Sequence, residues 1–352
     1  MDFKKYKKDF CYNFPSDENN NNEIEILLSY AENLFNQGLP IIYDQVHFSK
    51  LVGYDYAYLL SISNMQSFFY KEFSIPKKNG GVRTIMEPYP SLKEIQHWIL
   101  QYILEPAAPK NVSPIAKAFM PGISLRGNAK FHKNKKCVVA LDLHDFFGSV
   151  KYGSVYAIFE KLKYSKSVCT LLANLCTCDC CLPQGAPTSP MLSNLVFKEL
   201  DDKIFAYCRR NGILYTRYAD DLTFSSNQLS PQKIISYIKM LISSRGFRLN
   251  DEKTKVMGSG MCQEVTGVVV NKKMQVKRSY RDKIRQEIYF SIKYGFDNHL
   301  THMKNLPLWI KSPKHYINHL YGKVNFVLLV NPRDEEFIKY RNWLRGYLDY
   351  YE

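Results

Sequence analysis

Short apolar runs separated by turn-forming residues predict two β-hairpins. The first lies at 73–88, where the turn formers are Asn79, Gly80 and Gly81. The second lies at 213–225, where the β-rich runs ILYTRY and LTFS flank a short segment that contains two adjacent aspartates. The second hairpin therefore carries acidic side chains at its tip.

A further strand and two helical regions complete the predicted elements. The strand has the sequence CVVALDL, lies within 136–150 and runs directly into Asp142. Helical periodicity covers 23–38 and returns beyond Gly267, whereas the polar run DENNNN at 17–22 predicts a loop. Hairpins combined with helices predict an α+β fold.

The charge balance of the chain indicates a class of binding partner. Among 352 residues, 48 Lys and Arg face 33 Asp and Glu, a net charge of +15. Such a surplus favours a polyanionic partner, first of all nucleic acid. An anionic membrane surface is the second candidate, but no basic amphipathic helix supports it. The segment 261–352 alone holds 16 basic and 9 acidic residues, which suits contact with a phosphate backbone.

The chain shows no pattern typical of a membrane protein. No apolar run approaches the ~18 residues of a membrane span, and the N-terminus lacks the apolar stretch of a signal peptide. We therefore expect a cytoplasmic protein, no membrane contact, and nine reduced cysteines. Four cysteines cluster at 176–181 in a C-x-C-x-C-C spacing, which suits free thiols better than zinc ligands.

The adjacent Asp220 and Asp221 are the sharpest chemical feature. Two carboxylates at a tight turn between apolar strands repel each other, and hard divalent cations such as Mg²⁺ neutralise them best. Asp142, at the end of another strand, supplies a third carboxylate. The set suits two-metal phosphoryl transfer. A solvated hairpin turn is the alternative.

Tyr218, Ala219, Asp220 and Asp221 between two β runs resemble the active-site motif of reverse transcriptases. Other family motifs follow in order, and together they cover roughly 70–335. These motifs are Arg83 with Pro88 behind it, 140–147, 182–190 with Leu192 and Asn194, 246–250 with Lys253 and Thr254, and Leu320, Gly322, Asn331 and Pro332.

Two short stretches narrow the resemblance to bacterial retron enzymes. Asn128 and His132 stand in an Asn-Ala-x-x-His motif, and Val265, Thr266 and Gly267 form a Val-Thr-Gly motif. The resemblance implies that these five residues contact the enzyme's own structured RNA. His132 as a core or capping histidine, and Thr266 as an ordinary strand residue, are the alternatives.

The resemblance also implies a right-hand polymerase with fingers, an antiparallel-sheet palm and a helical thumb. The expected divisions follow the order of the motifs. They are an N-terminal extension at 1–45, fingers with part of the palm at 46–135, the palm with the active site at 136–262, and a basic helical thumb at 263–352.

Roles for individual residues follow from the matched motifs. Two Mg²⁺ ions, with Mn²⁺ as an alternative, would be held by the three aspartates and the backbone carbonyl of Leu143. Lys253 would neutralise or protonate the leaving pyrophosphate, or make a surface ion pair. The deoxynucleotide would be bound by Lys78, Arg83, Phe147, Gln184 and Gly185, with Phe147 excluding a 2′ hydroxyl. Phe146 and Phe147 are neighbours on an expected strand and would point to opposite faces, so one of them should belong to the core.

The function implied is RNA-directed DNA synthesis on a cognate noncoding RNA. The product would be a branched RNA–DNA hybrid (msDNA), made for anti-phage defence with an accessory effector protein, and a host RNase H would remove the template. Three alternatives remain: a non-retron defence or diversity-generating reverse transcriptase, an RNA-binding scaffold with an idle site, and an RNA-dependent RNA polymerase. A branched product would distinguish a retron enzyme from the other reverse transcriptases. Retention of all three aspartates argues against an idle scaffold. A preference for dNTPs over rNTPs would exclude an RNA-dependent RNA polymerase.

Overall fold

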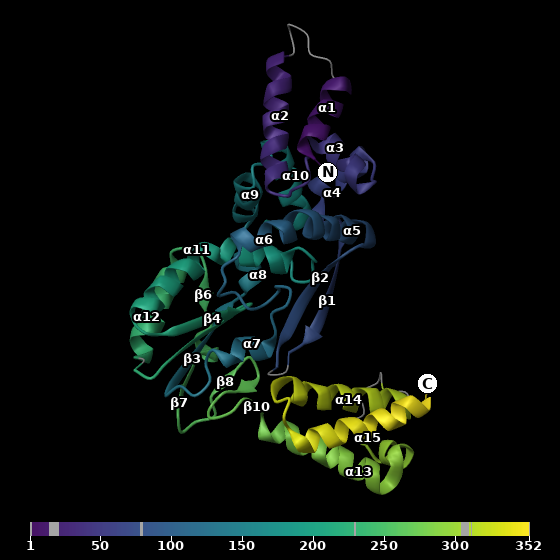
Figure 1. The fold of residues 1–352 in the computed structure, drawn as a ribbon, viewed down its shortest axis with the longest axis vertical. Coiled ribbons are helices and arrows are strands. Elements are labelled where there is room, and N and C mark those ends of the chain that lie inside the picture. Colours follow the sequence, from purple (N-terminus) through teal and green to yellow (C-terminus); the bar gives the residue numbers. More distant parts are fainter. Residues whose placement is uncertain are drawn as a thin grey trace. The chain divides into compact units, whose positions relative to one another are not determined.

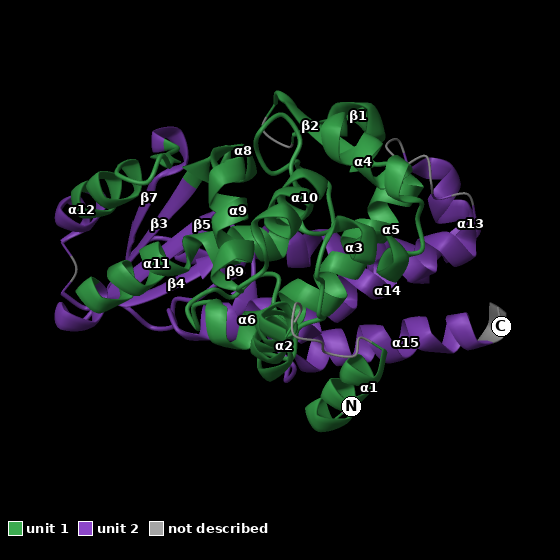
Figure 2. Ribbon diagram, turned by 90° about the horizontal axis from the view of Figure 1, so that it is seen from above, with its two compact units in different colours: residues 1–121, 143–207, 236–250 green, residues 122–142, 208–235, 251–352 purple. Residues whose placement is uncertain are grey.

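Antiparallel strands and helices alternate along the chain, which confirms the predicted α+β class (Figure 1). The computed structural model describes residues 2–13, 21–77, 80–228, 230–303, 310 and 312–351. Lys78 and most of the predicted polar loop, at 17–20, lie outside these residues, while the last two residues of that loop begin helix α2. Two compact units interleave along the chain, and Figure 2 colours them separately.

Unit 1 consists of residues 1–121, 143–207 and 236–250, and its core is mainly helical. The predicted helix at 23–38 is confirmed as α2, which is followed by a left-handed Gly38 with φ of 72°. Its helices are α1 (Phe3–Asn13), α2 (Asn21–Asn36), α3 (Gln45–Val52), α4 (Tyr56–Asn64), η1 (Gln66–Phe69), α5 (Pro90–Ile99), η2 (Leu100–Leu104), α6 (Glu105–Asn111), α8 (Phe146–Ser149), α9 (Tyr152–Lys161) and α10 (Lys166–Cys176). Helices α11 (Ser189–Arg210) and α12 (Pro231–Ser243) run from one unit into the other.

The first predicted hairpin is confirmed in unit 1. Strands β1 (Tyr70–Pro76) and β2 (Val82–Pro88) pair antiparallel over their whole length. Gly80 and Gly81 in the connection have φ of 81° and 77°, a left-handed conformation that favours glycine. The two glycines that the sequence indicated as turn formers therefore stand where the backbone conformation favours glycine.

Unit 2 consists of residues 122–142, 208–235 and 251–352, and it holds the second predicted hairpin. Its main sheet has the order β4–β5–β3–β7, with every pair antiparallel. The strands are β3 (Cys137–His144), β4 (Leu214–Tyr218), β5 (Asp221–Ser226) and β7 (Lys255–Gly258), with the 3-10 turn η3 (Asp251–Lys253) before β7. The last two residues of β3 belong to unit 1, where they pair with β6 (Arg248–Leu249).

The rest of unit 2 joins a small sheet to a helical region. Helix α7 (Leu125–Lys130) precedes β3, and the small sheet contains β8 (Glu264–Val265), β9 (Val268–Val269) and β10 (Gln275–Val276). The long helices that follow are α13 (Arg278–His302), α14 (Pro313–Val330) and α15 (Glu335–Tyr351). One hydrophobic core runs from Val265 and Val268 through Ile284 to Leu320 and Phe337. The predicted helical C-terminal region is confirmed from Arg278 onward, whereas the helix expected directly after Gly267 was wrong, because this segment forms β9 and β10 of the small sheet.

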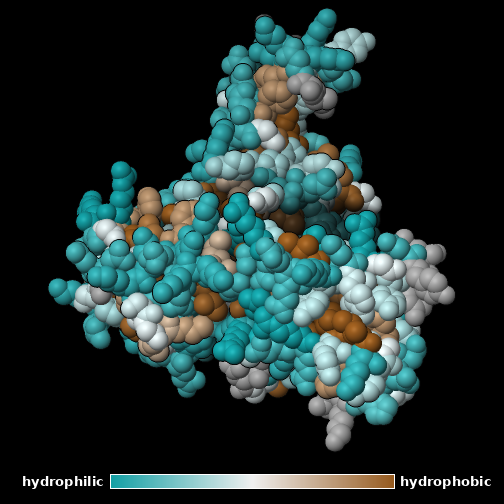
Figure 3. All heavy atoms as spheres, turned by 60° about the horizontal axis from the view of Figure 1, so that its bottom comes forward, coloured by the Kyte–Doolittle hydropathy of each residue, from teal (hydrophilic) through white to brown (hydrophobic). Residues whose placement is uncertain are grey.

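The exposed surface agrees with the polar composition of the chain. The face drawn in Figure 3 is mostly polar, and its apolar residues gather in separate small areas. None of the helices within the described part of the chain has the length and apolar character that crossing a bilayer requires. The boundaries of the four predicted subdomains stay a prediction, because the two compact units are interleaved and do not correspond to consecutive segments of the chain.

Candidate active site

Asp142 and Asp221 lie directly opposite each other on neighbouring strands of unit 2. They are the last residue pair in the register of β3 and β5. Tyr218 pairs with Asp221 across the hairpin, so Ala219 and Asp220 form a two-residue turn. Ala219 has φ of 57°, as the first central residue of a tight hairpin turn requires. The hairpin and the neighbouring strand β3 therefore bring three carboxylates to one end of the sheet, as the sequence predicted.

Arg217 supports this turn from inside, and the sequence reading missed it. Its side chain is fully buried on β4, and its Nη1 donates a 3.0 Å hydrogen bond to the carbonyl oxygen of Ala219. A left-handed alanine is uncommon, so a hydrogen bond to its carbonyl helps to hold the turn. The available signal was an arginine inside the otherwise apolar run ILYTRY.

The carboxylates are crowded and only partly compensated. Burial first, and then the charges of Asp220 and Asp142, raise the pKa of Asp221 to about 6, although Lys253 and Lys255 act in the opposite direction. Lys253 Nζ contacts both carboxylate oxygens of Asp142, at 2.9 Å and 3.0 Å. The ion pair foreseen for Lys253 thus exists, and its partner is a predicted metal ligand.

This donor set fits a divalent cation. Carboxylate oxygens are the ligands that Mg²⁺ prefers. The pKa of the partly buried Asp221 is raised by desolvation and by the neighbouring charges of Asp220 and Asp142, and a bound cation would relieve both effects. Across the described ranges, no three Asp, Glu, His or Cys side chains already converge as a finished ligand set. Instead, a lysine occupies the oxygens of Asp142. The side chain of Leu143, next to Asp142 in the chain, is buried.

In unit 1, the loop at Gln184 and Gly185 approaches the backbone of β2 so closely that position 185 requires glycine. Met86 on β2 donates a backbone hydrogen bond to the Gln184 carbonyl oxygen at 2.9 Å. A Cβ added to Gly185 would lie 2.7 Å from the Met86 carbonyl oxygen, and its φ is 138°. The glycine therefore permits docking of its own loop against β2. Arg83 is exposed on the same strand.

Of the two phenylalanines that follow Asp142, one is buried and the other is not, as expected, but the reason differs from the expected one. They were expected on a strand, where neighbours alternate, and that expectation was wrong. Asp145 adopts φ of 44° and the short helix α8 begins there. Phe146 is buried against Phe197 and Phe247, while Phe147 is half-buried, with Phe119 the nearest ring other than Phe146. Phe147 is thus the one that can meet a ligand.

The two retron-type motifs contact each other in unit 2. Asn128 is buried on α7, and its Nδ2 donates a 3.5 Å hydrogen bond to Thr266 Oγ1. Thr266 and Gly267 form the turn between β8 and β9, with φ of 46° and 85°, and Val265 enters the core. A positive φ is rare for a β-branched residue, so Thr266 is held in a strained conformation.

His132 has the core position that the sequence left open as an alternative. It is completely buried, and its ring nitrogens lie 2.8 Å from Ser225 Oγ and 2.8 Å from Thr216 Oγ1. Burial lowers its pKa to about 3, so the ring is neutral. His132 thereby ties the turn after α7 to both strands of the carboxylate hairpin.

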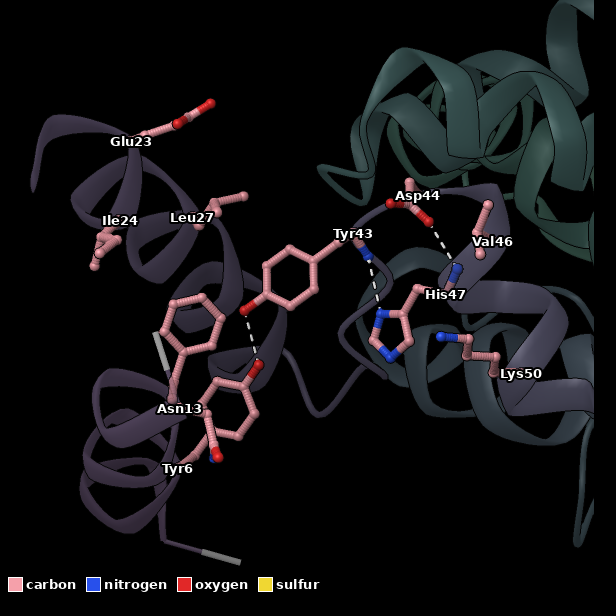
Figure 4. Close-up of a pocket in the computed structure, with 11 residues that line it drawn as sticks. Tyr6, Asn13, Glu23, Ile24, Leu27, Tyr43, Asp44, Val46, His47 and Lys50 are labelled. Carbon is pink, nitrogen blue, oxygen red and sulfur yellow. Dashed lines mark hydrogen bonds between the residues drawn. The ribbon is translucent and has the colours of Figure 1, made fainter. Parts of the chain in front are cut away.

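A separate cavity is lined by none of these groups. It is in unit 1, has a volume of about 750 Å³ and is lined by α1, α2, α3 and the segment before α3 (Figure 4). Tyr6 and Tyr43 share a 2.7 Å hydrogen bond there, and Asp44 caps α3 through the His47 amide. None of the predicted site residues lines it. The cysteines of the 176–181 cluster are free thiols, and Cys176 and Cys178 are buried.

Comparison with known proteins defines the class of this site. Residues 75–281, more than half of the chain, match the family model described as reverse transcriptase (RNA-dependent DNA polymerase). The chain is 32% identical over 283 residues to the retron Ec86 reverse transcriptase of Escherichia coli, covering 79% of this chain and 87% of that protein. It is 34% identical over 262 residues to the retron Mx65 reverse transcriptase of Myxococcus xanthus, covering 69% and 61%.

The chain therefore belongs to the reverse transcriptases, and within them to the retron type. It is an RNA-directed DNA polymerase with the α+β fold of the right-hand polymerases. Among solved structures, telomerase from Candida albicans with a fragment of telomeric RNA is similar at a TM-score of 0.48 and 10% identity, over 78% of this chain and 64% of that one.

Proposed function

We propose that the chain copies part of a cognate structured noncoding RNA into DNA at the carboxylates of unit 2. The observation that carries this proposal is the cross-strand pair of Asp142 and Asp221, with Asp220 in the adjoining turn. In the reaction a hydroxyl oxygen bonds to the α-phosphorus of a deoxynucleoside triphosphate. The bond to the bridging oxygen breaks, and pyrophosphate leaves with that electron pair.

The three aspartates and the backbone carbonyl of Leu143 would hold two Mg²⁺ ions, or Mn²⁺ in their place. When bound, such ions lower the pKa of the attacking hydroxyl and offset the charge of the leaving group. Asp221 must be ionised to serve as a ligand, so its raised pKa couples metal affinity to pH. Lys253 is exposed enough to leave Asp142 and neutralise pyrophosphate.

The residues of unit 1 are assigned on their motifs and on their exposure. Arg83 offers a planar fork for phosphate oxygens, and Lys78 a point charge. Phe147, half-buried at the start of α8, would exclude a 2′ hydroxyl. Gln184 and Gly185 form a loop fixed against β2, which would present backbone to the nucleotide and template.

The finer features of the function follow from the retron type. Synthesis would start at a 2′ hydroxyl of a guanosine in the cognate RNA and give a branched RNA–DNA hybrid. A host RNase H would remove the copied RNA in the cytoplasm, and an accessory effector protein would be restrained by the hybrid until phage infection. Asn128, His132, Val265, Thr266 and Gly267 would support recognition of this RNA, with the buried Asn128 and His132 acting through the turns that they hold.

The test is to purify the protein from cells that carry its native locus and to analyse the nucleic acid that comes with it. The expected result is a discrete DNA that is joined to RNA. RNase should shorten this hybrid by digesting its RNA, and a 2′–5′ debranching enzyme should release the DNA from the RNA. DNA without a branch would overturn the retron product and keep the polymerase. RNA alone would instead support a binding scaffold with an idle site.

A further inference from the structure

Two neighbouring turns of unit 2 carry a concentration of lysines that the active site does not use. One turn follows α7 at 130–136, and the other joins β9 to β10 at 271–274. We call the six lysines of these turns the lysine patch: Lys130, Lys133, Lys135, Lys136, Lys272 and Lys273.

The two turns are fixed against each other by one backbone hydrogen bond and by the bonds of a buried glutamine. The Asn134 amide donates to the Val270 carbonyl at 2.9 Å. Gln263, which is 1% exposed, donates from Nε2 to the Lys135 carbonyl at 2.8 Å, and its own amide donates to Asn271 Oδ1 at 2.9 Å. The lysines therefore project from a rigid base, which lowers the entropy lost when they bind a partner.

Among the residues that the structure describes, no Asp or Glu forms an ion pair with a lysine of the patch. Five of the six lysines are exposed, and Lys135 is half-buried. The stretches 128–141 and 265–281 contain no Asp or Glu at all. A solvated surface normally mixes both signs of charge, whereas a single-sign area attracts a polyanion.

The lysine patch lies at the opposite end of β3 from the carboxylates. Cys137 begins β3 next to the patch, and Asp142 stands five residues further along the same strand. At about 3.3 Å per residue, the two ends are about 17 Å apart. A nucleic-acid phosphate bound at the patch is therefore neither the phosphate that reacts at the carboxylates nor the next phosphate along the same nucleic-acid chain.

We propose that the lysine patch binds the phosphate backbone of the RNA partner outside the strand being copied. This inference rests on the proposed function, which supplies RNA as the partner. Lysines are point charges without the planar fork of arginine, so the contact anchors and orients RNA without reading its sequence. The patch lies on the two turns that Gln263 holds in place, and the first of these turns leads directly into β3, so an RNA anchored there is fixed relative to the strand that carries Asp142.

The test compares two variants of the full chain that each lose four positive charges. The first is Lys133→Ala, Lys136→Ala, Lys272→Ala and Lys273→Ala. The matched control is Lys4→Ala, Lys5→Ala, Lys7→Ala and Lys8→Ala on α1, whose lysines are exposed in unit 1. Binding to an RNA hairpin of unrelated sequence, about one and a half helical turns long, is measured by anisotropy over a range of salt concentrations.

The patch variant should bind the hairpin at least about tenfold more weakly, and its slope of log affinity against log salt should shrink by about two to four, since each lost phosphate contact removes about 0.9. The α1 variant should match the wild type. Equal losses in both variants, or no loss in the patch variant, would overturn the proposal. Extension of a short primed RNA by the wild type is measured separately, so failure of the polymerase itself is recognised independently of the binding result.

Discussion

Lys253 and Asp142 form a two-pronged ion pair in unit 2, with Nζ at 2.9 Å and 3.0 Å from the two carboxylate oxygens. The lysine side chain is 55% exposed and the aspartate side chain 11%. The positive charge thus stands where a metal ion would share the same oxygens. Lysine and cation should therefore compete for Asp142.

This competition predicts the behaviour of Lys253→Met, which keeps the side-chain length and removes the charge. Without Mg²⁺ the variant should lose about 1 kcal/mol or less of unfolding free energy, because the pair is half exposed. Added Mg²⁺ should raise its melting temperature more than that of the wild type. Lys255→Met is the control, since Lys255 also lowers the pKa of Asp221 but is not bonded to Asp142. An identical Mg²⁺ response in wild type and Lys253→Met would contradict the competition.

The buried His132 predicts a specific loss of stability in acid. Its pKa is lowered to about 3 in the folded protein, against about 6.5 in an unfolded chain. Between these values the unfolded state binds more protons, so stability falls as the pH drops below about 6.5. The loss approaches about 1.4 kcal/mol per pH unit, or about 2 kcal/mol by about pH 5.

Urea unfolding of His132→Gln at about pH 7 and about pH 5 checks this. The variant should be less stable at neutral pH, because Ser225 and Thr216 lose a ring partner, but its stability should depend less on pH. His315→Gln, at an exposed position on α14, should keep the full pH dependence. An unchanged pH dependence in His132→Gln would show that this ring is not the acid-sensitive group.

Gly185→Ala should destabilise unit 1. The new Cβ would lie 2.7 Å from the Met86 carbonyl oxygen, and φ of 138° is strained for alanine. We expect a loss of about 2 to 4 kcal/mol in denaturant unfolding, from steric overlap and backbone strain together. Gly153→Ala on α9 is the matched control, because its Cβ would meet open space, and it should be neutral or slightly stabilising. Equal stabilities of the two variants would rule out the close approach as the reason for glycine.

The turn at Thr266 allows a test of RNA recognition that leaves the fold intact. Thr266→Asn should tolerate φ of 46° better than threonine does, while it removes the hydroxyl that Asn128 contacts. DNA synthesis on the cognate RNA should fall by about tenfold, and synthesis on an unrelated primed RNA should stay within about twofold of wild type. A loss that is equal on both templates would mean that the turn is only structural.

Local sequence patterns were sufficient to predict the strands and turns that carry the chemistry. Short apolar runs bounded by turn residues located both hairpins, and the register of the sheet places Asp142, near the end of CVVALDL, opposite Asp221. These features depend on neighbours along the chain and on the sheet geometry that they dictate. The same reasoning failed at Phe146, where a left-handed Asp145 ends the strand and starts a short helix.

Contacts between segments that are distant in the sequence could not be predicted from the periodicity of apolar residues. The bond between Asn128 and Thr266 joins positions 138 residues apart, and no local pattern indicates it. Likewise, the approach of Gly185 to Met86 depends on the docking of a loop on a strand. Both positions were singled out by family motifs, so the resemblance located the residues while only the structure showed what they contact.

The most direct test of the account is primer extension on an RNA template by wild type and by Asp220→Asn with Asp221→Asn, in Mg²⁺ with deoxynucleotides. The wild type should extend the primer. The double variant should lose at least about a thousandfold, equal to about 4 kcal/mol of transition-state stabilisation, while its RNA affinity and melting temperature stay near wild type. Extension by the folded double variant at the wild-type rate would contradict the assignment of these aspartates as the catalytic centre.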